Sequence, residues 1–229
     1  MKKMLSLTAS VLSIAVIIIW QIFFDDTNYY IVAAAIIFFS MLPFLFSFEK
    51  SKPSARELTL IAGLIAIAVV SRAVFYLIPQ VKPIGAVVIV SGACLGAKRG
   101  FLIGAFSAFI SNFIFGQGIW TPFQMAALGV VGLAAGLIFS RNAKKLPLSV
   151  VGFILCFALY GIIVDLSSVL MLTGEYSIES VFAVYAAGVP FNLIFGLSTA
   201  VFLFLFGEAF EKKINRIVTK YGILEVKNE

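Results

Sequence analysis

The chain contains no histidine, and its two cysteines, Cys94 and Cys156, lie far apart inside apolar runs. A zinc site needs clustered ligands, and a disulfide framework needs several cysteines, so neither is expected. No HExxH, G-x-S-x-G or G-x-x-x-x-G-K-[ST] motif is present. These absences argue against a metalloprotease, a serine hydrolase and a chain that binds ATP through its own P-loop.

Charged residues are scarce: they make up 12% of the 229 residues, whereas 62% are hydrophobic. A soluble domain carries about twice that share of charge. Several apolar runs reach the ~20 residues with which a helix crosses a bilayer. No signal peptide with a small-residue cleavage site is recognisable, so the first apolar run is expected to stay in the protein. We therefore predict an all-α polytopic membrane protein.

We predict eight spans, separated by short connections. They cover residues 4–24, 28–48, 57–78, 84–97, 100–115, 121–140, 148–172 and 181–207. The polar linker 49–56 divides the chain into a two-helix N-terminal hairpin (1–55), a six-helix core (56–210) and a basic amphipathic cytoplasmic tail (211–229), which we expect on the inner membrane surface.

Two core spans, 84–97 and 100–115, are short. Straight helices of these lengths reach only about 21–23 Å, and the hydrocarbon core is ~30 Å thick. Short, glycine-interrupted segments indicate a binding site in transporters. The alternative is that each helix runs one turn into the interface, with Lys82 and Lys98 snorkelling.

The net charge is +6, and the distribution of the basic residues agrees with the predicted topology. With the N-terminus inside, every basic residue except Arg72 and Lys82 falls in a cytoplasmic segment, as the positive-inside rule requires. Both termini are then cytoplasmic. The basic charge is a topology signal, with contact to anionic lipid as a secondary role, and no nucleic-acid partner is expected.

Polar side chains gather where the run at 101–115 breaks at Gly116-Gln117-Gly118. Asn112, Gln117, Trp120 and Gln124 surround this break, Thr121 is expected to cap the next helix, and Pro122 suits its first turn. One interpretation is the mouth of a ligand site. The other is a membrane hairpin with Trp120 as an interfacial anchor.

Two ionisable residues, Arg72 and Asp165, lie well inside spans, both in the predicted outer third. A charge in hydrocarbon normally faces a partner or a wet cavity. We expect both to face an outward-open cavity, either paired with each other or reaching the ligand, together with Asn192 at similar depth. A pair that only fixes helix packing is the alternative.

Small residues form two stripes. Ala62-x-x-x-Ala66 places two alanines on one face of the span at 57–78, where another helix can approach closely. Gly129, Gly132 and Gly136 form a similar stripe on the span at 121–140, for which we expect internal packing.

Residues 56 to about 210 resemble the substrate-binding S component of an energy-coupling factor (ECF) vitamin transporter. The resemblance is carried by the six-helix core with short second and third helices, by Ala62-x-x-x-Ala66, and by the run at 92–136. Within that run, the element G-x-W-T-P-x-Q-M at 118–125 looks most similar to S components for cobalamin and related corrinoids. The hairpin at 1–55 departs from the six-helix pattern.

The resemblance implies a subunit of the bacterial cytoplasmic membrane that is not an enzyme and has no cofactor or metal of its own. It would bind a vitamin from outside, with cobalamin or a corrinoid expected and riboflavin, thiamine or a queuosine precursor as alternatives. Its implied partners are a transmembrane coupling protein, which Ala62 and Ala66 would meet, and two ATPases that use ATP. The subunit is expected to topple in the membrane to deliver its ligand.

The family places the ligand under the connections 79–83 and 116–122. The expected ligand-binding residues are Trp120, Gln124, Asn112, Asn192, Arg72, Asp165 and Gln117. An intramembrane enzyme is disfavoured because no second intramembrane aspartate accompanies Asp165. A non-transport membrane scaffold is the other alternative, and it would not need the polar cluster.

Overall fold

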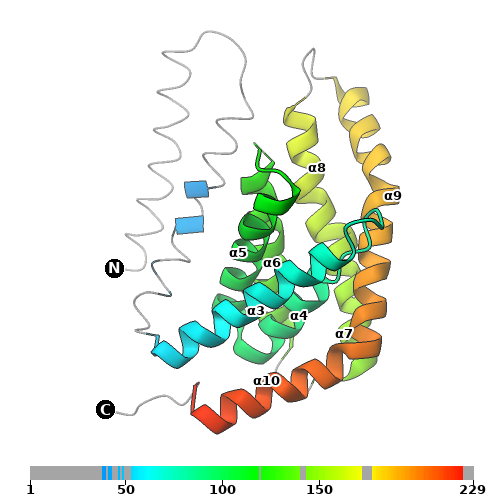
Figure 1. Cartoon of the computed structure of the whole chain (residues 1–229). Helices are drawn as coiled ribbons and strands as arrows, with labels where there is room; N and C mark the ends of the chain where they lie inside the picture. Colours follow the sequence, from blue (N-terminus) through cyan, green and yellow to red (C-terminus); the bar gives the residue numbers. More distant parts are fainter. Residues whose placement is uncertain are drawn as a thin grey trace.

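The computed structural model describes residues 38, 39, 41, 42, 46, 48, 53–118, 120–139, 143–171 and 177–223. The predicted spans 4–24 and 28–48 therefore lie almost wholly outside the described residues. The described chain forms a helical bundle (Figure 1). Its first helices are α3 (Ala55–Val74), α4 (Ile84–Leu95), α5 (Ala97–Phe115) and α6 (Thr121–Ile138). Next comes a helical segment made of α7 (Lys145–Ile154), the π-helical η1 (Leu155–Tyr160) and α8 (Gly161–Leu170). The last helical segment comprises α9 (Ile178–Phe202), the π-helical η2 (Leu203–Gly207) and α10 (Glu208–Tyr221).

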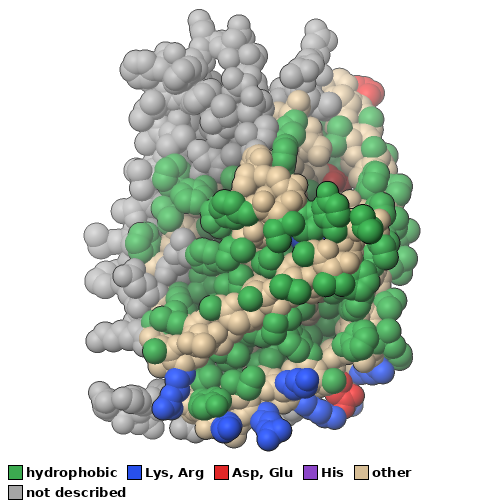
Figure 2. Space-filling model, in the orientation of Figure 1, with side chains coloured by type: hydrophobic (Ala, Val, Ile, Leu, Met, Phe, Trp, Pro, Cys, Tyr) green, Lys and Arg blue, Asp and Glu red, His purple; other side chains and the backbone are tan. Residues whose placement is uncertain are grey.

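The surface of the bundle is that of a membrane protein. Four described segments are long and apolar enough to cross a bilayer, namely Ala55–Val74, Thr121–Ile138, Lys145–Leu170 and Ile178–Tyr221. Large side chains such as Val74, Leu77 and Phe182 are exposed. Figure 2 shows hydrophobic side chains over most of one face, with lysine and arginine gathered along the edge where α10 lies. Such a continuous apolar surface requires lipid or a partner to cover it.

The short apolar helix α4, of 12 residues, lies at the centre. All 12 of its residues are buried, because α4 is apolar on every side and packs against neighbours all round. The predicted short second core helix is thus confirmed. The expectation for the third is wrong: α5 has 19 residues, because its first turn includes Ala97, Lys98 and Arg99, which had been assigned to the preceding span or to a connection.

Glycines allow α4, α5 and α6 to approach closely. A Cβ atom on Gly132 would collide with the carbonyl oxygen of Gly100, and one on Gly104 would collide with the carbonyl oxygen of Leu128. Backbone groups cannot turn away as a flexible side chain can, so these positions require glycine. The prediction that the glycines of α6 serve internal packing is confirmed.

The last helical segment bends. α9 runs along the side of the bundle, and α10 crosses its base beneath α3 (Figure 1). The change of direction coincides with η2, and π-helical turns are a recognised cause of sharp bends. Ile214 and Val218 of α10 are buried in the core. The tail helix therefore docks on the bundle through these residues, a contact that the expectation of a surface-lying helix did not include.

Candidate ligand site and coupling face

The chain reverses between α5 and α6 in a tight glycine-containing loop. α5 ends at Phe115 and Gly116 has a φ of 100°, which a residue with a side chain rarely adopts. The predicted break at 116–118 is confirmed. The expected role of Thr121 is wrong, because Thr121 is the first residue of α6 and the capping position is Trp120. The Thr121 hydroxyl instead accepts a hydrogen bond from the Gly118 N–H (3.1 Å) and donates one to Gln117 Oε1 (2.9 Å).

Asn112 connects this loop to the helices around it. The side chain is 1% exposed. Its Nδ2 donates to Gln124 Oε1 at 2.9 Å and to Thr121 Oγ1 at 3.2 Å. Its Oδ1 accepts from Arg72 Nη1 at 3.0 Å. One buried amide therefore links α3, α5 and α6. Because Thr121 also bonds to Gln117, four of the predicted site residues belong to a single hydrogen-bonded network, namely Arg72, Asn112, Gln117 and Gln124.

Arg72 is the charged member of the network. It is 8% exposed, and Nη1 also donates to Ser111 Oγ at 2.5 Å. Its guanidinium carbon lies 4.1 Å from the centroid of the Phe115 ring. Arg72 Nε is buried and has no hydrogen-bond partner. The guanidinium is thus held by neutral groups, and part of its donor capacity is unused.

Asp165 belongs to a second cluster. It accepts from Asn192 Nδ2 at 2.7 Å, which connects α8 to α9. The carboxylate lies directly over Gly188, where a Cβ atom would collide with it. The described residues contain no ion pair between Arg72 and Asp165. The pairing considered from the sequence is therefore absent, and each charge has its own amide partner.

Trp120 and Gln117 lie at the exposed edge of the loop. Trp120 is 38% exposed, and its ring lies against Gly118. Gln117 is exposed, and its Nε2 donates to the Phe109 carbonyl at 2.9 Å. Both side chains are accessible to a ligand that arrives over the loop, whereas Asn112 would be reached only by a group that enters the network.

The connection between α3 and α4 carries a further cation, Lys82. Lys82 Nζ donates to Gln80 Oε1 at 2.9 Å, and the Lys82 N–H donates to Ser198 Oγ on α9 at 3.4 Å. Burial, and then the nearby charge of Arg72, lower the pKa of Lys82 to about 8. Sequence reasoning did not include Lys82 among the site residues, although it and Arg72 were the two basic residues outside the cytoplasmic segments.

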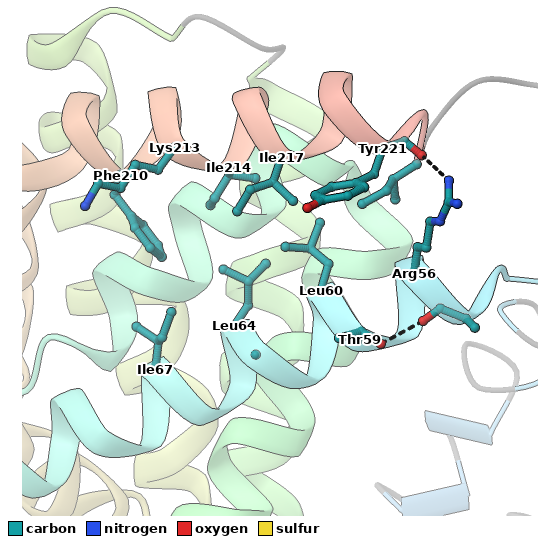
Figure 3. A pocket seen from close by; sticks show the side chains of 13 residues that line it. Arg56, Thr59, Leu60, Leu64, Ile67, Phe210, Lys213, Ile214, Ile217 and Tyr221 are labelled. Atoms are coloured by element: carbon teal, nitrogen blue, oxygen red, sulfur yellow. Dashed lines mark hydrogen bonds between the residues drawn. The ribbon is translucent and has the colours of Figure 1, made fainter.

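The middle of α3 presents the small-residue face. Ala62, Gly63 and Ala66 are exposed, while Ala68, on the other side of the helix, is fully buried. Beside this face runs a groove of about 590 Å³ between α3 and α10. In Figure 3 the side chains of Leu60, Leu64 and Ile67 on α3 point toward Phe210, Ile214, Ile217 and Tyr221 on α10.

Two polar contacts hold the start of α3 in place. Arg99 Nε lies 2.6 Å from Glu57 Oε1, an ion pair that joins α5 to α3. Arg56 Nη1 donates to the Tyr221 carbonyl at 3.4 Å and closes one end of the groove (Figure 3). A second hollow of about 220 Å³ shares Ile67 and Phe210 with the groove and extends it toward η2. The apolar surface available to a partner is therefore longer than the groove alone.

Comparison with known proteins gives one family. Residues 52–212 match the family model described as "ECF-type riboflavin transporter, S component". No curated protein and no solved structure matches the chain. Among the described residues no group of three or more histidine, cysteine or carboxylate side chains could hold a metal ion. The family match spans more than half of the sequence, from the start of α3 into α10, and the chain therefore belongs to the ECF-type riboflavin transporter S-component family.

Proposed function

We propose that this S component is the substrate-specificity subunit of an ECF importer. It binds a vitamin at the Arg72–Asn112–Gln124 end of the bundle and delivers it through a coupling protein and two ATPases. The family match carries the proposal. The geometry supports it, because the polar network and the apolar groove lie toward opposite ends of α3. A membrane scaffold would need neither a buried polar network nor an exposed loop tryptophan beside it.

Riboflavin is the first ligand to test, since the matching family is described by it. A flat heteroaromatic ring suits the exposed Trp120, which offers a stacking face, and Gln124 and Gln117, whose amides both donate and accept. Cobalamin or a related corrinoid is the second candidate. The loop sequence at 118–125 supports it, and so do the amide groups that corrinoids carry on their periphery.

The coupling protein is proposed to dock on the small-residue face of α3. Ala62 and Ala66 are exposed and adjoin the α3–α10 groove, so a partner helix can approach the backbone of α3 closely. Nothing in the described part of the chain covers this face. The basic residues of α10 would then lie near the partner, and the positive-inside rule supports a cytoplasmic position for them.

The topology can be tested separately by labelling single cysteines in intact cells. Cysteine at Glu179, in the first turn of α9, should be labelled from outside. Cysteine at Lys144, before α7, should be labelled only after permeabilisation. Labelling of Glu179→Cys from the inside alone would reverse the orientation and place the polar network in the cytoplasm.

Ligand-dependent stabilisation tests the function. Purified protein should be unfolded thermally with riboflavin, cobalamin, cobinamide or thiamine. A ligand at 100 times its Kd adds about 2.7 kcal/mol to the free energy of unfolding. The stabilising vitamin should bind about tenfold more weakly to Trp120→Ala and Asn192→Ala, because each removes a polar or stacking partner. If no vitamin stabilises the protein and it fails to co-purify with a coupling protein, the scaffold alternative is favoured.

A further inference from the structure

The groove between α3 and α10 is apolar along its length and basic at both ends. Its lining includes Arg56 and Lys213 but no aspartate or glutamate of the described chain. In Figure 3 Arg56 lies at one end, beside Tyr221, and Lys213 lies at the other, beside Phe210. Most of the remaining lining is aliphatic, with Thr59 as a polar exception. The groove therefore suits an occupant that combines an apolar body with a negative charge.

Arg56 has hydrogen-bond donors to spare. Its side chain is exposed, and the bond from its Nη1 to the Tyr221 carbonyl is long, at 3.4 Å. A guanidinium has five N–H donors in a planar fork that matches the oxygens of a phosphate. Lys220, also exposed, places its Nζ 5.3 Å from the centroid of the Tyr221 ring. Two cations therefore accompany Tyr221 at this end of the groove.

No carboxylate among the described residues forms an ion pair with these two cations. The ion pairs in this part of the chain are Arg99–Glu57 and Lys212–Glu208. Glu57, in the first turn of α3, is 6% exposed and lies 2.6 Å from Arg99 Nε. It is absent from the lining of the groove. The positive charge beside Tyr221 is therefore available to an anion from outside the described chain.

The other end of the groove has room for a hydrocarbon chain. The hollow of about 220 Å³ that continues the groove past Ile67 and Phe210 has no polar or charged side chain in its lining. From Thr59 to Ile67 the groove follows α3 for eight residues, about 12 Å. One leaflet is about 15 Å of hydrocarbon, half of the ~30 Å core. The groove and the hollow together therefore match the length of one acyl chain.

We propose that the α3–α10 groove binds an anionic phospholipid of the cytoplasmic leaflet. Arg56 and Lys220 hold the phosphate, and one acyl chain lies along Leu64 and Ile217 toward Phe210. The positive-inside rule assigns α10 to the leaflet that carries anionic lipid, where basic pockets between helices bind lipid headgroups. This is a discrete site, beyond the general attraction of a basic tail to the membrane surface. The proposal rests on the predicted topology and is independent of the transported ligand.

Phosphatidylglycerol and phosphatidylcholine with the same acyl chains differ in headgroup charge, so their binding to the full chain in detergent tests the headgroup contact. Native mass spectrometry measures the bound lipid. The wild type should bind phosphatidylglycerol about tenfold more tightly, the effect of one charge-assisted hydrogen bond. Arg56→Gln should lose most of this preference. Arg216→Gln, the same change at an exposed arginine of α10 outside the groove lining, should keep it. Equal losses in the two variants would reduce the effect to diffuse surface charge and refute the headgroup contact.

Ile217→Trp tests the path of the acyl chain. Ile217 is 38% exposed and lines the groove, so an indole at this position fills space that the chain needs. Both lipids should bind about tenfold more weakly to this variant, because part of the chain is no longer buried. Ile154→Trp, at an exposed position of α7 outside the groove and the second hollow, should bind both lipids as the wild type does. Equal binding by the two tryptophan variants would overturn the acyl-chain site.

Glycerol 3-phosphate separates a bound lipid from a bound phosphate. It carries a phosphate but no acyl chain, and it should not displace phosphatidylglycerol at equal concentration. Displacement would show a site for the anion alone and overturn the proposal. The melting temperature without added lipid checks that all four variants fold. A wild type that binds neither lipid, but co-purifies with the coupling protein and loses it in Ile217→Trp, would assign the groove to a partner helix instead.

Discussion

Asn112 and Ser107 lie on the same helix, α5, but their replacement by alanine is expected to change stability in different ways. Both side chains are buried in α5, at 1% and 0% exposure. Asn112 makes three hydrogen bonds, to Arg72, Thr121 and Gln124. Ser107 Oγ has no hydrogen-bond partner. Asn112→Ala therefore removes a hydrogen-bonded polar group, whereas Ser107→Ala removes a hydroxyl that makes no hydrogen bond.

The size of the effect follows from the partners that are left. Asn112→Ala takes one acceptor from the buried Arg72, a charged bond of about 1.5–3 kcal/mol, and one donor from Gln124, a neutral bond of about 0.5–1.5 kcal/mol. Thr121 keeps its bonds to Gly118 and Gln117. The free energy of unfolding should fall by about 3 kcal/mol, which lowers the melting temperature by about 6–12 °C. Ser107→Ala should leave it unchanged or raise it, since a buried hydroxyl without a partner is destabilising.

Thermal unfolding of the purified proteins in one detergent measures both variants under matched conditions. Both alanine substitutions shorten a buried polar side chain of α5, so the comparison isolates the hydrogen bonds from the general loss of a polar side chain. An equal fall in melting temperature for the two variants would show that Asn112 contributes packing alone. The network around Arg72 would then have no stabilising role.

Further predictions concern packing and pH. Gly104→Ala should destabilise the protein by about 2–3 kcal/mol, since the new Cβ collides with the Leu128 carbonyl and α5 must move away from α6. Gly63→Ala should instead raise the free energy of unfolding by up to about 1 kcal/mol, because a Cβ atom at Gly63 meets no neighbour and alanine has the higher helix propensity. Lys82, with its pKa lowered from 10.5 to about 8, binds fewer protons in the folded than in the unfolded state between these pH values. The free energy of unfolding should therefore rise with pH from about 8 to 10.5, and Lys82→Gln should lose this rise in denaturant titrations. The same pH dependence in the wild type and in Lys82→Gln would contradict the lowered pKa of Lys82.

The depth of the polar residues could be predicted from the sequence, but their rotation about the helix axes could not. The positive-inside pattern and the hydrophobic runs placed Arg72 and Asn112 at one level, and the structure joins them at 3.0 Å. The same reasoning placed Asp165 at that level without showing which way it faces. Successive residues of a helix are turned by about 100°, so a small error in register changes the partner. Arg72 therefore bonds to α5, while Asp165 bonds to Asn192 on α9.

The contacts of Thr121 and of α10 could not be predicted from the sequence, for a different reason. Thr121 reads as a capping residue because it precedes a proline, but the tight turn at Gly116 starts α6 one residue earlier than that reading requires. The amphipathic pattern of α10 does not distinguish a lipid surface from a protein surface, since both are apolar. The bend at η2 decides between them by bringing Ile214 into the core.

α3 carries both candidate sites, and this makes their functions separable. Ala66 lies on the exposed face beside the groove, and Arg72 is fixed to α5 by hydrogen bonds of 2.5 and 3.0 Å. Six residues separate them, about 9 Å along the helix axis. Ala66→Leu adds bulk where a partner helix would approach and touches none of the network, so uptake should fall while ligand affinity is kept. Arg72→Gln removes the charge from the network and should reduce both. Ala186→Leu, an equivalent change at an exposed alanine of α9, should reduce neither. If Ala66→Leu weakens ligand binding as much as uptake, that face of α3 supports the fold of the ligand site, and the coupling surface must lie elsewhere.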